Sequence, residues 1–137
     1  WSKFRLNVCN NLPQAILGAG VGCYQDSVHM KAISDGLRAE LEAIAAAKGI
    51  DLRLVEASSR HGSAVPPTAR YSTLQDLDAG RHTEIDMFSG ALIRMGKELG
   101  IPTPYNEYTY HMIKALEEKN DGLFDYDKAN RKSTWAT

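Results

Sequence analysis

Three polar side chains near the start of the sequence have a spacing that could support chemistry. Lys3, Asn7 and Asn11 recur at i, i+4 and i+8, so a helix would stack an amine and two carboxamides along one side. An ammonium group is a strong donor to an oxygen on which negative charge develops. Asparagine is a poor residue for a helix interior, which favours a purpose for the pair, although a solvated polar face is the simpler alternative.

A second polar cluster lies in the stretch "YSTLQDLDAGRHTEID". Its members crowd into fifteen residues: Ser72, Gln75, Asp76, Arg81, Thr83, Glu84 and Asp86. Helix capping accounts for four of them, because "STLQ" and "TEID" both match the capping-box pattern. Glu84 would then occupy a first helical turn, where the helix dipole favours a carboxylate by about 0.3–1 kcal/mol. The functional alternative is that Glu84 faces Lys3 across a cleft and helps to set its protonation.

The glycines in "ILGAGVG", residues 16–22, do not form a dinucleotide-binding loop. That loop needs G-x-G-x-x-G between a strand and a helix, whereas Gly18, Gly20 and Gly22 are spaced G-x-G-x-G after a segment with a helical pattern. Cys23 stands where the third glycine should be. We therefore expect small residues that end one helix and let a neighbouring segment pack closely.

Composition bounds the class of protein. A chain of 137 residues that is 43% hydrophobic can bury one core, so we expect one domain. With 16 Lys and Arg against 17 Asp and Glu, it has no electrostatic footprint for nucleic acid or for an anionic membrane. Its longest apolar run, residues 15–23, is too short to cross a bilayer. We expect a cytoplasmic protein whose ligand is small or is another protein.

Cysteine and histidine give no sign of a metal site. Cys9 and Cys23 lie in one apolar region without C-x-x-C spacing, which favours buried thiols in a reducing compartment. The histidines show no paired ligand spacing; they are His29, His61, His82 and His111. We predict no metal.

Apolar periodicity and capping signals predict an all-α fold. The expected helices cover residues 3–19, 28–48, 72–80, 83–99 and 104–120. Residues 50–71 are expected to form a long loop, with a short extended piece around Leu52 and Leu54. Residues 1–120 would form the helical domain and 121–137 a polar tail. The chain opens on Trp1 without an initiator Met, so we expect a piece of a longer protein.

Particular residues set the expected boundaries of these helices. Pro13 should bend or interrupt the first helix. Asp26 or Ser27 should cap the second helix, and Gly49 should stop it. The fifth helix should have Thr103 as its cap and Pro104 as its first residue.

Taken together, these motifs resemble one known family. Lys-x3-Asn-x3-Asn is followed by Ser-x2-Gln-Asp, then by Arg-x-Thr-Glu-Ile-Asp, and finally by "GIPTPYN". Their order, and the twelve-residue step from Ser72 to Glu84, are similar to the C-terminal domain of the ketopantoate reductase family. The resemblance runs from Trp1 to about Glu118. It implies a compact multi-helix domain of the 6-phosphogluconate dehydrogenase C-terminal-like type.

The resemblance also implies an activity. In this family a Rossmann domain precedes the helical domain, and substrate and nicotinamide meet in the cleft between them. The implied function is the catalytic and substrate-binding half of an NADPH-dependent 2-oxo acid reductase. The favoured reaction is 2-dehydropantoate 2-reduction, from ketopantoate to pantoate in pantothenate biosynthesis. NADPH would be held mainly by the N-terminal domain absent from this chain, so we expect the isolated chain to be inactive.

Family roles carry over to matching positions. Lys3 matches the general acid that protonates the keto oxygen as hydride reaches the carbon. Asn7 and Asn11 match asparagines that hold the lysine and the substrate's hydroxyl and keto oxygens. Ser72 matches a residue that binds the substrate carboxylate. Glu84 matches the carboxylate that contacts a substrate hydroxyl and tunes the site.

Two features keep alternatives open. Thr73 stands where many members have methionine, and residues 52–70 do not align, so another 2-oxo acid could be the substrate. A different class of function would be a helical dimerisation or interaction module whose polar stripe is simply surface. The sequence does not fix the oligomeric state, and a homodimer is one option.

Overall fold

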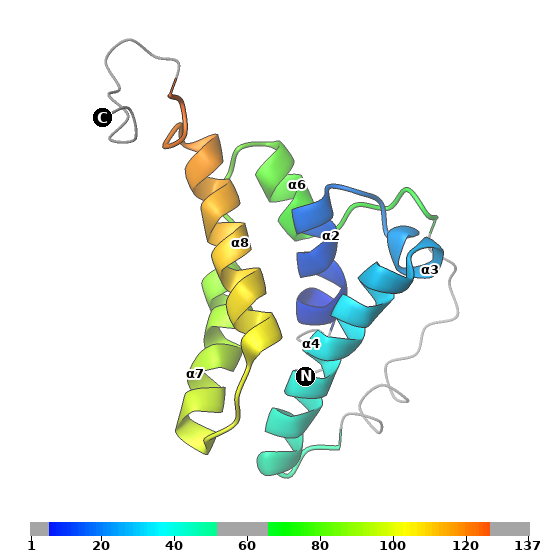
Figure 1. Ribbon diagram of the computed structural model, residues 1–137, viewed down its shortest axis with the longest axis vertical. Helices are drawn as coiled ribbons and strands as arrows, with labels where there is room; N and C mark the ends of the chain where they lie inside the picture. Colours follow the sequence, from blue (N-terminus) through cyan, green and yellow to red (C-terminus); the bar gives the residue numbers. More distant parts are fainter. Residues whose placement is uncertain (1–5, 52–65, 127–137) are drawn as a thin grey trace.

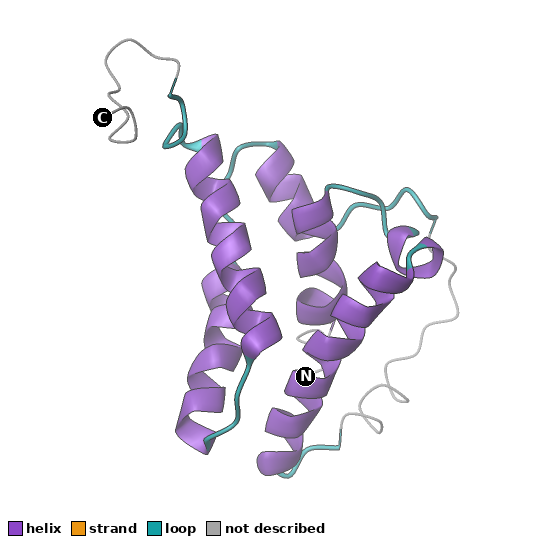
Figure 2. Cartoon of the chain, in the orientation of Figure 1, coloured by secondary structure: helices purple, strands orange, loops and turns teal. Residues whose placement is uncertain are grey.

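The computed structural model describes residues 6–51 and 66–126 of the chain. Within these ranges every regular element is helical, and Figure 2 shows no strand. The elements are the π-helix η1 (Leu6–Asn11), α2 (Leu12–Leu17), α3 (Cys23–Asp26), α4 (Val28–Ala47), α6 (Ser72–Asp78), the 3₁₀-helix η2 (Ile85–Met87), α7 (Ser89–Leu99) and α8 (Pro104–Asn120). The predicted all-α class is confirmed.

The helices form a bundle with α2 near its centre. In Figure 1, α7 and α8 run side by side, α4 lies across from them, and α6 packs against α2. The segment η1 continues into α2 and contacts both α4 and α6. The first predicted helix therefore packs between the other helices of the domain.

Two clusters of apolar side chains fill the bundle. One joins η1, α4 and α7 through Val8, Cys9, Leu37, Leu41, Ile44, Ala45 and Leu92. The other joins α2, α6, η2 and α8 through Leu12, Ala15, Leu74, Leu77, Ile85 and Ile113. Apolar periodicity predicts a stripe of Ile33, Leu37, Leu41 and Ile44 on the second helix; the last three are fully buried, whereas Ile33 is 38% exposed. The periodicity therefore identified the core face of α4 from Leu37 onward.

Helix ends agree with the sequence wherever local chemistry decides them. The hydroxyl of Ser27 caps α4 by accepting from Met30 N at 3.2 Å. Gly49, at φ +78°, follows the end of that helix in the left-handed conformation that favours glycine. The helix α8 begins at Pro104 and ends at Asn120, as predicted. The one-turn helix α3 was not predicted, since four residues carry no usable periodicity.

The first helix departs from the prediction of one element over 3–19. Residues 6–11 form a π turn, and α-geometry begins only at Leu12. Pro13 causes part of this change, because it has no N–H to donate to the carbonyl four residues earlier. The predicted interruption at Pro13 is confirmed. The helix ends at Leu17, two residues early, because Gly18 takes φ 75° and donates its N–H to Gln14 O at 2.8 Å.

The predicted helix 83–99 is wrong in its first turns. It is divided into η2 and α7, and Phe88 between them has the non-helical angles φ −105° and ψ −93°. The N–H and hydroxyl of Thr83 both donate to Glu117 of α8, at 2.7 and 2.6 Å, and the hydroxyl also accepts from Ile85 N at 3.2 Å. Thr83 therefore bonds both the start of η2 and a distant helix, and no long helix follows it.

The predicted capping box at Ser72 is also wrong. Ser72 is the first residue of α6, Tyr71 holds the N-cap position, and no side chain caps the helix. The side-chain amide of Gln75 donates to Arg70 O at 2.6 Å and does not return to Ser72. The exposed Ser72 hydroxyl therefore has no capping role.

Other predicted features lie outside the described residues. They are the extended piece around Leu52 and Leu54, most of the 50–71 loop, and all but the first six residues of the 121–137 tail. Residues 121–126 form turns after α8.

Candidate active site

The structure places the sequence-predicted site residues on three segments. Asn11 is buried where η1 meets α2, Ser72 is exposed at the first residue of α6, and Glu84 is exposed in the bend before η2. Asn7 lies in η1, where only its backbone is described, and Lys3 lies outside the described residues. Because α6 contacts both η1 and α2, the helices that carry Asn11 and Ser72 are direct neighbours. The predicted meeting of Glu84 with Lys3 stays a prediction.

A tyrosine hydroxyl interrupts the hydrogen-bond ladder of the helix that carries Asn11. Tyr24 of α3 accepts from Gln14 N at 3.0 Å and donates to the carbonyl oxygen of Asn10. These two backbone groups would bond each other in a regular α-helix. A side chain inserted in this way is a recognised cause of helix distortion, and π turns are frequent at functional sites. Burial raises the pKa of Tyr24, so its hydroxyl keeps the proton that it donates.

One buried amide links this helix to the start of α6. Gln14 is fully buried, and its Nε2 donates to Ala69 O at 2.7 Å while its Oε1 accepts from Tyr71 N at 2.9 Å. Tyr71 directly precedes Ser72. The helix of Asn11 is therefore bonded to the backbone beside Ser72.

A buried carboxylate holds the segment that carries Glu84. Glu117 of α8 is 3% exposed and accepts both hydrogen bonds from Thr83. Cationic groups lie at longer range from Glu117 Oε1, with Lys114 Nζ at 3.6 Å and His82 Nδ1 at 3.8 Å. Partial burial acts to lower the pKa of Lys114, but the carboxylates of Asp86 and Glu117 outweigh it, so the pKa is raised and the ammonium persists.

The Glu84 carboxylate itself stays available. With other described residues it forms no hydrogen bond and no ion pair, although the backbone around it is fixed. A carboxylate on an anchored backbone, with its oxygens exposed, can accept hydrogen bonds from a ligand.

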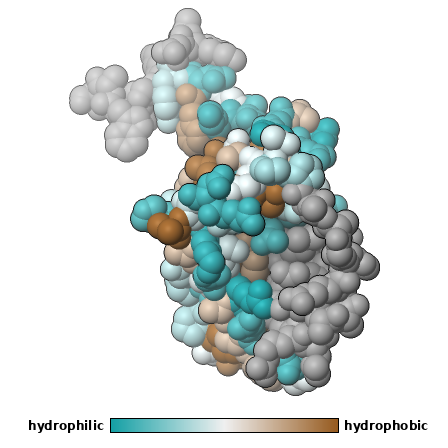
Figure 3. Space-filling view, turned by 90° about the vertical axis from the view of Figure 1, so that its right-hand side faces the viewer, coloured by the Kyte–Doolittle hydropathy of each residue, from teal (hydrophilic) through white to brown (hydrophobic). Residues whose placement is uncertain are grey.

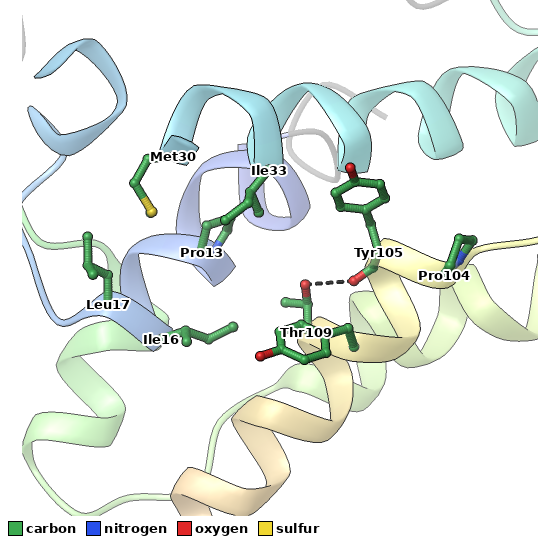
Figure 4. A pocket seen from close by; sticks show the side chains of 9 residues that line it. Pro13, Ile16, Leu17, Met30, Ile33, Pro104, Tyr105 and Thr109 are labelled. Carbon is green, nitrogen blue, oxygen red and sulfur yellow. Dashed lines mark hydrogen bonds between the residues drawn. The ribbon is translucent and has the colours of Figure 1, made fainter. Parts of the chain in front are cut away.

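A groove of about 510 Å³ opens between α2, α4 and α8 (Figure 4). The side chains that line it are mostly apolar: Pro13, Ile16, Leu17, Met30, Ile33, Pro104, Tyr105, Tyr108 and Thr109. The Thr109 hydroxyl already donates to Tyr105 O at 2.7 Å. Asn11, Ser72 and Glu84, the sequence-predicted site residues whose side chains the structure describes, do not line this groove.

A sequence model of one known family covers most of the chain. The family is described as Ketopantoate reductase PanE/ApbA C terminal, and the match spans residues 1–117. This chain belongs to that family. The resemblance drawn from Lys3, Asn7, Asn11, Ser72 and Glu84 is thereby confirmed at the level of the family.

Curated relatives of this family member carry one name. A 2-dehydropantoate 2-reductase of Pyrobaculum aerophilum is 32% identical over 119 residues, which are 85% of this chain and 42% of that protein. A 2-dehydropantoate 2-reductase of Archaeoglobus fulgidus is 27% identical over 119 residues, or 85% of this chain and 40% of that protein. The chain thus spans less than half the length of these relatives.

Solved structures show the same fold. A PanE/ApbA family ketopantoate reductase from Ralstonia eutropha JMP134 superposes with a TM-score of 0.73 at 28% identity, covering 88% of this chain and 41% of that one. D-mandelate dehydrogenase, solved with NADH and anilino(oxo)acetate, has a TM-score of 0.76 at 26% identity, covering 87% and 51%. The similar proteins are oxidoreductases, which places this ketopantoate reductase-type domain in an oxidoreductase family.

In this family member the "GAGVG" glycines end one helix and allow close packing, as predicted: Gly18 ends α2 at φ 75°, and Gly20 and Gly22 lie against Pro67. A Cβ on Gly20 would lie 2.3 Å from Pro67 O, and one on Gly22 would lie 2.8 Å from the Pro67 side chain. The N–H groups of Val21 and Gly22 donate to Ala69 O and Pro67 O, both at 2.9 Å. These donors are therefore already used and cannot cradle a phosphate.

Sequence reasoning missed two buried carboxylates, Glu40 and Glu117. Glu40 lies on the core face of α4, between Leu37 and Ile44 in helical spacing, and accepts from Tyr105 N at 2.7 Å and Asn106 N at 3.0 Å. Thr103 holds the predicted N-cap position of α8, but its side chain makes no cap bond, and Glu40 supplies the capping contacts from another helix. A charged residue inside an apolar stripe was the signal that could have revealed Glu40.

The described ranges offer neither a cluster of metal-binding side chains nor a membrane-spanning helix. No group of three or more His, Cys, Asp or Glu there could hold a metal ion. Cys9 and Cys23 are both thiols, Cys9 buried and Cys23 partly buried, and burial raises the Cys23 pKa. No helix of residues 6–51 or 66–126 is long and apolar enough to span a membrane. The face shown in Figure 3 mixes hydrophilic areas with smaller hydrophobic ones.

Proposed function

We propose that this chain supplies the substrate-binding and proton-donating half of a nicotinamide-dependent 2-oxo acid reductase. NADPH is the proposed hydride donor and 2-dehydropantoate the favoured substrate. The observation that carries the proposal is the joint presence of Lys3, Asn7, Asn11, Ser72 and Glu84 inside the matched family segment. The curated relatives named 2-dehydropantoate 2-reductase support the choice of substrate.

When bound, a reduced nicotinamide would supply the hydride that the keto carbon receives in the proposed reaction. The Lys3 ammonium gives its proton to the keto oxygen, so the carbonyl becomes a hydroxyl and the lysine leaves the step neutral. A donor placed where negative charge develops lowers the barrier because the charge is stabilised as it forms. Water then restores the proton to the amine.

The polar residues of the described segments fit binding of a 2-oxo acid. The Asn11 carboxamide is buried at the junction of η1 and α2, where a directional donor and acceptor can fix an oxygen in one orientation. Ser72 provides a hydroxyl at the start of α6 for the substrate carboxylate. Glu84 provides an acceptor for a substrate hydroxyl, on a backbone anchored by Glu117.

We assign no cofactor phosphate contact to residues 16–22 of this chain. The N–H groups of Val21 and Gly22 are bonded to the 67–69 backbone, so the glycine segment does not fit a pyrophosphate. This is consistent with NADPH binding mainly to a preceding nucleotide-binding domain, as the family resemblance implies.

The test is reductase activity of the protein as its gene encodes it. NADPH oxidation is followed with 2-dehydropantoate, with pyruvate and with an aryl 2-oxo acid, and each assay is repeated with NADH. We expect kcat/KM for 2-dehydropantoate to exceed that for the other acids by at least about tenfold, or about 1.4 kcal/mol. Preference for another acid would correct the substrate. Absence of turnover with every 2-oxo acid would refute the reductase and favour an interaction module.

A further inference from the structure

We propose that Gln14 is a positioning residue, which sets the place of Ser72 relative to Asn11 in the substrate site. The inference rests on the proposed function, because it takes Ser72 and Asn11 as substrate-binding residues. Gln14 itself does not touch substrate in this scheme. It acts by joining two backbone segments that carry the residues that do.

The geometry around Gln14 supports such a link. Its amide is fully buried and bonds two backbone groups, Ala69 O at 2.7 Å and Tyr71 N at 2.9 Å. These partners are 55 and 57 residues away in sequence, so the bonds join segments that local structure cannot hold together. Gln14 lies three positions after Asn11, and Tyr71 lies one position before Ser72.

The Tyr71 bond is the sensitive one. Ala69 O also accepts from Val21 N at 2.9 Å, so it keeps a partner when the Gln14 amide is removed. Tyr71 N would lose its acceptor, and a partly buried donor without an acceptor is driven to move towards water. Tyr71 holds the N-cap position of α6, so this movement would displace the first residue of that helix, Ser72.

The position needs an amide because it needs one donor and one acceptor at the end of the same side chain. Methionine is of similar length but provides no strong hydrogen-bonding group. An ionised glutamate provides acceptors alone, so it would meet Ala69 O with oxygen against oxygen. Protonation of a glutamate restores the missing donor. Gln14→Met and Gln14→Glu therefore give two independent perturbations of the same link.

The experiment compares both variants with Ser89→Ala in the protein as its gene encodes it. Ser89 is a matched control, since its fully buried hydroxyl donates to Asn106 Oδ1 at 3.1 Å, between α7 and α8. For Gln14→Met we expect KM for the 2-oxo acid to rise about tenfold while kcat stays within about threefold. For Gln14→Glu, the KM ratio to the unaltered protein should fall towards one as the pH is lowered. Ser89→Ala should leave KM within about twofold.

Amide hydrogen exchange of Tyr71 gives a readout that does not depend on turnover. The Tyr71 N–H should exchange at least about tenfold faster in Gln14→Met than in Ser89→Ala. Each variant is measured at the same number of degrees below its own melting temperature. Unchanged KM in a folded Gln14→Met variant would overturn the inference. If the unaltered protein reduces no 2-oxo acid, the proposed function fails. Unchanged Tyr71 exchange would then refute the link as well, and faster exchange would retain it as a structural tie.

Discussion

Two of the groups of polar side chains that tie the described part of this domain together differ in what they hold. At one end, Tyr24 and Gln14 bond backbone groups of η1, α2 and the segment before α6. At the other, Glu40 accepts from the first turn of α8, and Asn106 links it to Ser89 of α7. The first group is neutral and lies beside proposed substrate-binding residues. The second contains a carboxylate and joins helices that carry none of them.

The difference follows from the partners. Free N–H groups at a helix N-terminus carry partial positive charge, so a carboxylate satisfies them and the helix dipole together. Glu40 therefore holds the first turn of α8 against α4. The irregular backbone around Gln14 offers one donor and one acceptor side by side, which suits an amide. We expect changes in the first group to alter activity as well as stability, and changes in the second to alter mainly stability.

Replacing the proposed proton donor should give the largest effect. Lys3→Ala should lower kcat by roughly 10²–10⁴, the usual contribution of general acid catalysis. The melting temperature should change little, because a lysine ammonium contributes no apolar burial. The matched control is Lys97→Ala, at an exposed position in the last turn of α7. Activity of Lys3→Ala within about threefold of the unaltered protein would remove Lys3 from the mechanism.

Weakening the hydrogen bonds between Glu40 of α4 and the first turn of α8 should reduce mainly the stability of the protein. Glu40→Gln replaces one acceptor oxygen with a donor that faces N–H groups, so the free energy of unfolding should fall by about 3 kcal/mol. Urea unfolding measures this change. Glu42→Gln, at an exposed neighbour paired with Arg38, should change it by less than about 0.5 kcal/mol. Below the unfolding transition both variants should keep KM within about twofold. A large KM change in Glu40→Gln would contradict the expectation that this group affects mainly stability.

Removing the hydroxyl that interrupts the first helix should affect both properties. Tyr24→Phe leaves Asn10 O and Gln14 N without their shared partner, which should cost about 1–2 kcal/mol. Because the path of η1 would adjust, kcat/KM should also fall by about tenfold, or about 1.4 kcal/mol. Unfolding and steady-state kinetics test this, with Tyr108→Phe at an exposed position as the control. Equal kinetics for the two variants would mean that the hydroxyl does not shape the site.

Charge at the start of α6 should separate binding from folding. Ser72→Asp places a carboxylate in an exposed first helical turn, where the dipole favours it by about 0.3–1 kcal/mol. The melting temperature should hold or rise slightly. KM for the 2-oxo acid should rise at least about tenfold, equivalent to about 1.4 kcal/mol, because two carboxylates repel. Ser72→Asn is the neutral control. Equal KM values for both variants would show that Ser72 does not bind the substrate carboxylate.

The smallest effect concerns pH. The Tyr110 hydroxyl donates to Asp86 Oδ1 at 2.7 Å, and this bond, followed by burial, raises the pKa of Tyr110. The resulting stabilisation is present below the unfolded pKa of about 10 and is lost as pH rises through the folded pKa. Tyr110→Phe should therefore reduce the fall in melting temperature between about pH 9 and about pH 11. An identical fall in both proteins would show that this bond contributes nothing to stability.

Patterns within one helix turn were enough to predict several elements. The Ser27 cap, the start of α8 at Pro104 and the interruption at Pro13 follow from side chains acting on their own backbone, and the buried face of α4 follows from apolar periodicity. The spacing of Gly18, Gly20 and Gly22 likewise excluded a phosphate loop before the packing of Gly20 and Gly22 against Pro67 was known. The order of the Lys-x3-Asn-x3-Asn, Ser-x2-Gln-Asp, Arg-x-Thr-Glu-Ile-Asp and "GIPTPYN" motifs was enough to identify the family.

Tertiary structure alone decided what distant residues do to the backbone. Thr83 carries a capping pattern, yet Glu117 takes both of its donors, and the expected helix breaks into η2 and α7. Ser72 carries the same pattern but caps nothing, since it is the first residue of α6 and follows Tyr71, whose N–H is bonded to the distant Gln14. Local sequence fixes the preferences of a helix, whereas a buried polar group must find a partner wherever the folded chain provides one. In this protein those long-range partners determine how the segments that carry the proposed site residues are held.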